Sequence, residues 1–120
     1  MPVRAIRGAV QVDADDADAI LDGTADLVTA VLDRNALTAD RIISVIFSVT
    51  DDLTAAFPAV AARRLGLTEV PLMCVREIPV PGSLERVVRL LAHAETARPR
   101  SAIRHVYLRG AAALRRDLVS

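Results

Sequence analysis

The chain has 120 residues, 52% of them hydrophobic and 25% charged, and its arginines balance its acidic residues to a net charge of zero. This composition predicts one globular domain, and the absence of a basic excess argues against a nucleic-acid-binding protein. No apolar run reaches membrane-spanning length and no signal-peptide core follows Met1, so we expect a cytoplasmic protein that does not bind membranes. The single Cys74 excludes an intramolecular disulfide and a multi-cysteine metal site.

Charge is divided unevenly along the chain. Residues 1–60 contain four arginines and ten aspartates, whereas residues 61–120 contain eleven arginines and five acidic residues. We therefore expect any anion-binding site to draw on the second half. Solvated acidic and basic faces, or faces that complement each other within the fold or across subunits, would give the same pattern.

The first 50 residues predict a strand, a helix and a second strand. β-Branched residues favour an opening strand over residues 3–11. The acidic run at 13–16 suits the start of a helix, whose apolar stripe continues to Asn35. Residues 42–49 are apolar enough for a central strand that is covered on both faces.

The following segment predicts a second helix and a third strand. The polar run at 50–52 is expected to cap a helix that has Pro58 in its first turn and stops at Gly66. A third strand is expected over residues 70–77, and the prolines that follow it break the strand.

The last third predicts a third helix and a fourth strand. Gly82 and Ser83 are expected to open the helix, and its buried face would carry Leu84, Val87, Val88 and Leu91. Residues 98–100 are expected to form a loop and residues 103–108 a strand, followed by a short turn and a polar tail. The predicted order is β-α-β-α-β-α-β, which fits one α/β layer pair.

The sequence contains none of the common cofactor motifs. We find no P-loop, no dinucleotide-type glycine fingerprint, no paired-histidine metal motif and no nucleophile elbow. His93, in the predicted third helix, and His105, in the fourth strand, suit structural positions. Arginine remains as the chemistry-bearing residue, since several guanidinium groups at one cleft would bind carboxylates or phosphates. The arginines that are candidates to converge are Arg7, Arg63, Arg89 and Arg115.

Several segments, in this order, carry a family resemblance: Arg4-Ala5-Ile6-Arg7-Gly8-Ala9, Phe57-Pro58-Ala59 followed by Arg63, Val70-Pro71-Leu72-Met73-Cys74-Val75-Arg76-Glu77, Arg89, and Ile103-Arg104-His105-Val106-Tyr107-Leu108. Together they resemble the monofunctional chorismate mutases of the small trimeric bacterial type. The resemblance implies a single domain over residues 1–120, with 106–120 as a C-terminal strand and flexible-ended tail. It implies an α/β (α+β) subunit with a mixed sheet, and a homotrimeric pseudo-α/β-barrel with active sites between neighbouring subunits.

The same resemblance implies an activity and a set of site residues. The reaction is the [3,3] rearrangement of chorismate to prephenate, on the route to phenylalanine and tyrosine, and it needs no metal, cofactor or nucleophile. Three positions depart from relatives, because Val60 stands where some have lysine, Met73 where a threonine is known, and Arg116 where a proline can follow the matched Arg115. The implied site comprises Arg7, Phe57, Ala59, Arg63, Met73, Cys74, Glu77, Arg89, Tyr107, Leu114 and Arg115.

Each implied residue has an expected role. Arg89 would place positive charge at the ether oxygen of chorismate, where negative charge develops as the C–O bond stretches. Arg7 would bind a carboxylate and help hold the reactive conformer, and Glu77 would accept a hydrogen bond from the ring hydroxyl. The remaining residues would bind substrate: Tyr107 at a carboxylate, Cys74 near the hydroxyl, Phe57, Ala59 and Leu114 at the ring wall, and Arg63 and Arg115 at the entrance.

Two other hypotheses remain open from the sequence. One is a trimeric deaminase of enamine or imine intermediates, which has a similar subunit shape and an arginine at an intersubunit cleft. The other is a trimeric module that binds an aromatic carboxylate without turnover. Glu77, Arg89 and Tyr107 in their contexts favour the mutase over both.

Overall fold

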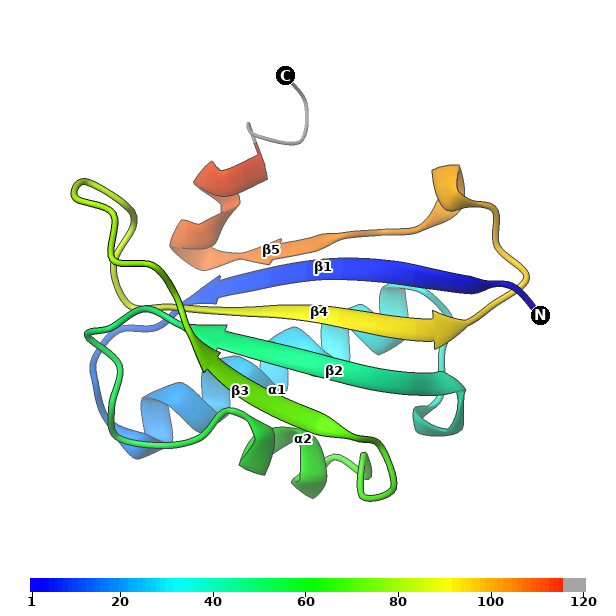
Figure 1. Ribbon diagram of the computed structural model, residues 1–120, viewed down its shortest axis with the longest axis horizontal. Helices are drawn as coiled ribbons and strands as arrows, with labels where there is room; N and C mark the ends of the chain where they lie inside the picture. The colour runs from blue at the N-terminus through cyan, green and yellow to red at the C-terminus, as the bar shows by residue number, and fades with distance from the viewer. Residues whose placement is uncertain (116–120) are drawn as a thin grey trace.

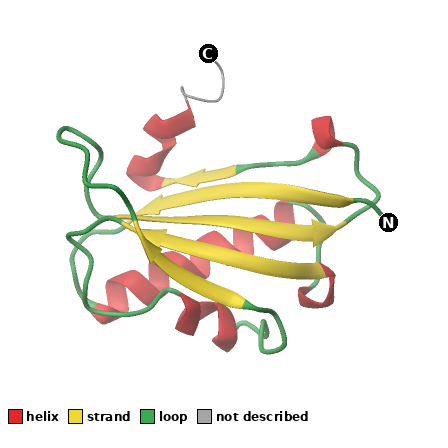
Figure 2. Ribbon diagram, in the orientation of Figure 1, coloured by secondary structure: helices red, strands yellow, loops and turns green. Residues whose placement is uncertain are grey.

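The computed structural model describes residues 1–115, which form one sheet with helices packed behind it (Figures 1 and 2). The elements in chain order are β1 (Val3–Gln11), α1 (Ala17–Arg34), the 3-10 turn η1 (Ala39–Arg41), β2 (Ile42–Val49), α2 (Ala59–Arg64), β3 (Leu72–Arg76), β4 (Val87–Glu95), the 3-10 turn η2 (Arg100–Ala102), β5 (Val106–Leu108) and the 3-10 turn η3 (Arg109–Arg115). This confirms the expected mixed sheet packed with helices.

The five strands lie in the order β3-β2-β4-β1-β5. The central strand β4 runs antiparallel to both of its neighbours, β2 and β1, whereas β3 and β5 pair in parallel at the two edges. The longest pairing joins β1 to β4 over the full length of both strands, from Val3 opposite Glu95 to Gln11 opposite Val87. β4 is therefore paired with a neighbouring strand along both of its edges, and these two pairings fix the positions of its residues.

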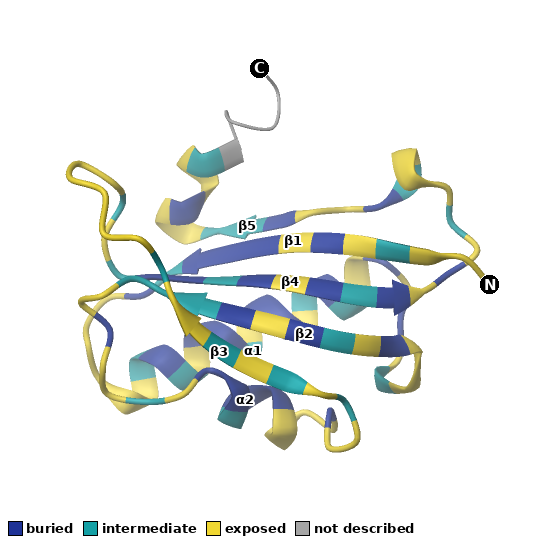
Figure 3. Cartoon of the chain, in the orientation of Figure 1, coloured by how far each residue is buried: buried dark blue, intermediate teal, exposed yellow. Residues whose placement is uncertain are grey.

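One face of the sheet forms the core. Phe47 of β2, Ile6 of β1 and Leu27 of α1 are fully buried and belong to one apolar cluster between the sheet and the helices. Gly8 allows this close packing, because a Cβ at that position would lie 3.0 Å from the Leu27 side chain. Among residues 1–115, no α-helix covers the opposite face, here called the open face, which looks toward the viewer in Figure 3 and shows many exposed positions.

The helix boundaries follow the signals in the sequence. Asp16 caps α1, since its carboxylate accepts a hydrogen bond from the Ala19 N–H at 3.1 Å, and the helix ends at Asn35. Gly66 follows α2 with a φ of +100°, a left-handed conformation that glycine adopts freely. These predictions are confirmed.

The predicted third helix is wrong, because residues 87–95 form the central strand β4. Val88, Leu90, Ala92 and Ala94 are buried on the helix side, and the residues between them, including Arg89 and His93, lie on the open side. The apolar run Val87 to Leu91 satisfies a helical spacing as well as a two-residue alternation, so the pattern alone was ambiguous. The element order is therefore β-α-β-α-β-β-β.

Two smaller predictions also need correction. The strand expected over residues 103–108 is limited to β5, and η2 occupies part of the expected loop. No side chain caps α2, whose N-cap residue is Pro58. Asp52 accepts hydrogen bonds from the Arg86 backbone instead. Within the part of the chain that the structure describes, no helix is both long and apolar enough to cross a bilayer.

Candidate active site

An arginine–glutamate pair lies on the open face of the sheet. β4 supplies Arg89, and Glu77 follows the end of β3, where its N–H donates to the Val49 carbonyl at 2.9 Å. Arg89 Nε lies 2.9 Å from Glu77 Oε1, and the Ser48 hydroxyl donates to Glu77 Oε2 at 3.1 Å. Both charged side chains are partly buried, which strengthens their attraction compared with a surface pair.

The pair is an ion pair without a well-aligned hydrogen bond. Arg89 Nε is buried, and among residues 1–115 its N–H has no hydrogen-bond acceptor despite the short distance to Glu77. A buried donor that lacks an acceptor is rare in folded proteins and calls for a functional explanation. Because Nε is buried against Glu77, a ligand would have to contact the terminal nitrogens of this guanidinium, whose side chain is 35% exposed.

The sheet register places this arginine in one row with residues from all five strands. Ser48 of β2 lies opposite both Val75 of β3 and Arg89 of β4, while Ala9 of β1 lies opposite Arg89 and Tyr107 of β5. Residues directly opposite one another in a sheet share a face. Two of the predicted site residues, Arg89 and Tyr107, thus lie on the same face with one strand between them.

Two adjoining cavities open beside the arginine. The larger has a volume of about 700 Å³ and contains Ser48, Glu77 and Arg89 in its wall. The second, of about 460 Å³, contains Phe57 and Cys74. The two cavities share Val75 and Arg76, and each is large enough for a small organic ligand. Of the predicted site residues, Glu77 and Arg89 thus share the wall of the larger cavity, and Phe57 and Cys74 share the wall of the second.

Three further predicted residues are not part of these cavity walls. Ala59 is buried at the start of α2, and Arg63 is exposed on the same helix. Met73 is 58% exposed on the open face of β3. An isolated chain therefore leaves Arg63 and Met73 in contact with solvent.

The other predicted residues gather on the β1–β5 side. Tyr107 and Leu114 pack in a small apolar cluster around Ala9, and Tyr107 lines a separate cavity of about 350 Å³. Arg7 follows the same alternation as Ala9, so it lies on the open face and is exposed. The side chain of Arg115 lies outside the described residues.

A histidine contacts the backbone of this second group. His105 Nδ1 accepts a hydrogen bond from the Arg7 N–H at 3.0 Å, just before β5 begins. Burial lowers the pKa of His105 below its ordinary value of 6.5, and the positive charge of Arg7 lowers it further. The imidazole is therefore neutral at neutral pH, and because Nδ1 accepts a hydrogen bond, its single ring proton lies on Nε2.

The larger cavity has an excess of negative charge. Its wall contains four carboxylates, from Asp51, Asp52, Glu77 and Glu85, against the two guanidinium groups of Arg76 and Arg89. Among residues 1–115, no three His, Cys, Asp or Glu side chains come together as metal ligands. A dianionic ligand would require more cations than this wall provides.

Known proteins match the chain along almost its full length. A family model for chorismate mutase type I matches residues 3–118. The chain belongs to the chorismate mutase type I family. This chorismate mutase is 50% identical over 119 residues to the chorismate mutase AroH of Thermus thermophilus, covering 98% of each chain. It is 38% identical over 119 residues to that of Bacillus subtilis, covering 98% of this chain and 94% of the relative.

A solved structure agrees with these relatives. A chorismate mutase from Clostridium thermocellum superposes with a TM-score of 0.91 at 49% identity, covering 92% of this chain and 98% of that one. The resemblance found in the sequence is confirmed, and the protein is an isomerase. The family assignment favours the mutase over the imine deaminase and the non-catalytic binding module.

Sequence reasoning missed two polar residues of the site. Ser48 lies within the apolar run of β2, where a polar residue at an alternate position was a signal that one strand face is not core. Asp52 was assigned to a helix cap, and its contact with Arg86 joins residues 34 positions apart. Arg89 was singled out from the sequence although its strand was predicted as a helix, and its role stays a prediction.

Proposed function

We propose that this chorismate mutase converts chorismate to prephenate at sites that form between subunits of a homotrimer. The observation that carries the proposal is Arg89, which lies in the wall of the larger cavity and pairs there with Glu77. The rearrangement breaks the ether C–O bond and forms a C–C bond within one molecule. It therefore needs charge stabilisation and orientation, and no covalent or acid–base step by the protein.

Arg89 would act on the charge that develops during the reaction. The ether oxygen becomes more negative as its bond stretches, and a guanidinium held in place by Glu77 meets that charge without reorganising. Burial of the pair lowers the local dielectric and strengthens the interaction. Glu77 would also accept a hydrogen bond from the ring hydroxyl, with Cys74 nearby.

The remaining residues would hold chorismate in its compact reactive conformer. Arg7 and Tyr107 would bind carboxylates, which restrains the flexible side chain of the substrate. Phe57 and Leu114 would form an apolar wall against the ring, and Ala59, buried in α2, would support Phe57 from the core. Arg63, Arg115 and the exposed Met73 would lie at the entrance.

A trimer would supply what the isolated cavity lacks. The carboxylates in its wall outnumber the guanidinium groups, whereas Arg7 and Tyr107 lie in a separate group on the β1–β5 side. A neighbouring subunit that brings its Arg7 and Tyr107 to this cavity would balance the charge of a dianion.

The open face of the sheet supports the same assembly. Met73, Ile46 and Leu91 form one row across β3, β2 and β4 by register, and each is more than a third exposed. A contiguous apolar surface of this kind is typical of a protein–protein interface.

Use of chorismate for phenylalanine and tyrosine synthesis would place the enzyme in the cytoplasm, together with its substrate.

A turnover assay tests the proposed reaction. Purified protein without added metal or cofactor is expected to remove the ultraviolet absorbance of chorismate, and acid treatment is expected to convert the product to phenylpyruvate. Arg89→Ala is expected to abolish the turnover while the protein stays folded by circular dichroism. A folded trimer that leaves chorismate unchanged would refute the proposal and favour a binding module.

A further inference from the structure

A strained arginine lies just before the central strand. Arg86 has a φ of +51°, a left-handed conformation that a residue with a side chain rarely adopts. Its backbone N–H donates to both carboxylate oxygens of Asp52, at 3.0 and 3.3 Å. Asp52 thus holds the chain in this conformation at the residue before β4 begins.

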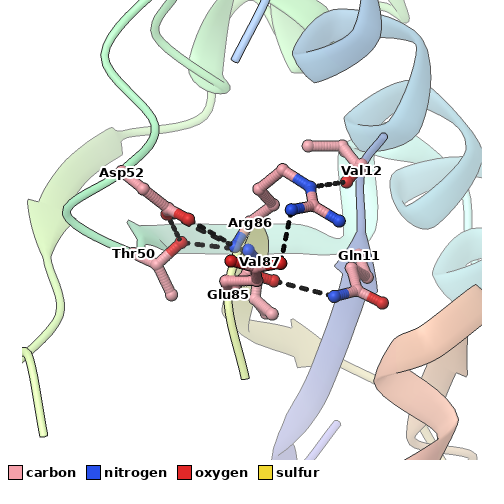
Figure 4. A network of polar contacts seen from close by, with 7 residues as sticks. All are labelled: Gln11, Val12, Thr50, Asp52, Glu85, Arg86 and Val87. Carbon is pink, nitrogen blue, oxygen red and sulfur yellow. Dashed lines mark hydrogen bonds and ion pairs between the residues drawn. The ribbon is translucent and has the colours of Figure 1, made fainter. Parts of the chain in front are cut away.

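The start of β4 is held from both neighbouring strands (Figure 4). On the β2 side, the Thr50 hydroxyl accepts from the Val87 N–H at 3.0 Å and donates to Asp52. On the β1 side, the Val12 N–H donates to the Arg86 carbonyl at 2.8 Å, and Arg86 Nε donates to the Val12 carbonyl at 3.0 Å. Asp52 and Thr50 therefore join the ends of β2 and β4, and Arg86 joins β4 to β1.

This network sets the position of the site arginine. Arg89 lies two residues after Val87, opposite Ser48 on one side and Ala9 on the other. A slip of one residue in β4 would move the Arg89 side chain to the helix-covered face, away from Glu77. The left-handed residue Arg86 comes immediately before Val87, where the pairing of β4 with β1 begins.

We propose that Asp52 is a positioning residue for Arg89, which it serves by stabilising the left-handed backbone of Arg86 and the register of β4. The proposal rests on the proposed catalytic role of Arg89. The Asp52 carboxylate lies in the wall of the same cavity, yet both of its oxygens accept hydrogen bonds from protein groups. Its action on the substrate is therefore indirect, through the strand that bears the arginine.

Asp51 provides a matched control for the charge of Asp52. It lies in the same cavity wall, and among the described residues its carboxylate accepts no hydrogen bond. If Asp52 acted only as a negative charge that repels the substrate, Asp51→Ala and Asp52→Ala would both lower KM and leave kcat alone. If Asp52 positions Arg89, Asp52→Ala lowers kcat about tenfold or more beyond the effect of Asp51→Ala, since small misplacements of a reacting group are costly.

Two further variants test the path through Arg86. Asp52→Asn keeps one acceptor oxygen, so its kcat is expected to lie between those of the wild type and Asp52→Ala. In Arg86→Gly, the backbone at position 86 no longer needs Asp52 to stabilise its left-handed conformation, because glycine adopts positive φ freely. The loss caused by Asp52→Ala is therefore expected to be several-fold smaller in the Arg86→Gly background than in the wild type. Equal losses in both backgrounds would overturn the proposal.

A readout without substrate separates this proposal from the proposed function. The Nε–H signal of Arg89 in the ¹H–¹⁵N NMR spectrum, identified by its absence in Arg89→Lys, is expected to shift in Asp52→Ala and to stay in place in Asp51→Ala. An unshifted signal in Asp52→Ala would refute the positioning role even if the enzyme is active. If Asp52→Ala does not fold, Asp52→Asn carries the same comparison. A shifted signal in a protein that does not turn over chorismate would support positioning and refute the function.

Discussion

Arg89→Lys tests how the site uses the geometry of arginine, beyond its charge. Lysine keeps the positive charge, but a methylene group replaces Nε, the atom that lies 2.9 Å from Glu77 Oε1. The pair with Glu77 is lost at that point, and the planar fork of donors becomes a single ammonium group. Among the described residues, the Glu77 carboxylate then keeps just the hydrogen bond from the Ser48 hydroxyl at 3.1 Å.

The expected loss follows from the role assigned to Arg89. Removing one donor that stabilises developing charge in a transition state costs roughly 3 to 4 kcal/mol, or about 10² to 10³ in kcat. Because the interaction is made mainly in the transition state, kcat and kcat/KM are expected to fall together. A stopped or continuous assay that follows the loss of chorismate absorbance over a range of substrate concentrations gives both constants.

Arg76→Lys is the matched control for this prediction. Arg76 lies in the walls of both cavities but forms no ion pair among the described residues. Its conversion to lysine is expected to change kcat less than about threefold, as for most surface substitutions. A kcat of Arg89→Lys within the range of this control would refute the idea that the guanidinium fork stabilises the transition state.

Two other predictions concern assembly and stability. Leu91→Glu places a charge on the open sheet face and is expected to dissociate the proposed trimer, because an unpaired buried carboxylate is costly. Leu65→Glu, on the helix side, is expected to leave assembly intact. Sedimentation velocity measures both, and a trimeric Leu91→Glu would contradict the proposed interface. Hydrogen bonds from the Thr54 N–H, the Thr54 hydroxyl and the Ala55 N–H hold the pKa of Asp15 below its ordinary value of 3.8. Because the pKa of Asp15 is lower in the folded state, its ionised carboxylate stabilises the fold above pH 3.8, and this stabilisation is lost as the pH falls through the pKa of the folded state. The Tm advantage of the wild type over Asp15→Asn is therefore expected to be full near neutral pH and to shrink on acidification. A difference in Tm that does not change with pH would rule out this titration.

The sequence alone predicted the elements whose signals are local. The bounds of β1 and β2 agree with the predicted strands, and α1 begins and ends at the residues that its capping pattern indicated. Capping and alternation depend on residues a few positions apart, which a single sequence displays directly. The same holds for Gly66, whose backbone freedom marked the end of α2.

The error at β4 has a different origin. The segment around Val87 to Leu91 fits both a helix and a strand, and the choice is made by pairing with β1 and β2, which lie far away in the sequence. Tertiary pairing outweighs local pattern for such short apolar runs. The role of Asp52 escaped prediction for the same reason, since its partner Arg86 lies 34 positions later in the sequence, beyond α2 and β3.

The candidate site was predicted largely through resemblance. The spacing of the arginines suggested that several of them converge at a cleft. It did not show that Arg89 pairs with Glu77, or that Tyr107 lies in a different group from both. Those relations come from the sheet register, which places Arg89 and Tyr107 on one row with β1 between them. The partition into two groups leads to the proposal that neighbouring subunits share each site.

Complementation between inactive subunits tests that claim most directly. Arg7→Ala and Arg89→Ala subunits are each expected to be inactive, and both are to be co-expressed in equal amounts, with mixed trimers verified by native mass spectrometry. If each site takes Arg7 from one subunit and Arg89 from the next, random assembly of closed trimers leaves about a quarter of the sites with both arginines. The account predicts recovery of about that fraction of wild-type activity. Verified mixed trimers with no more activity than either parent would show that one chain supplies both residues, and would contradict it.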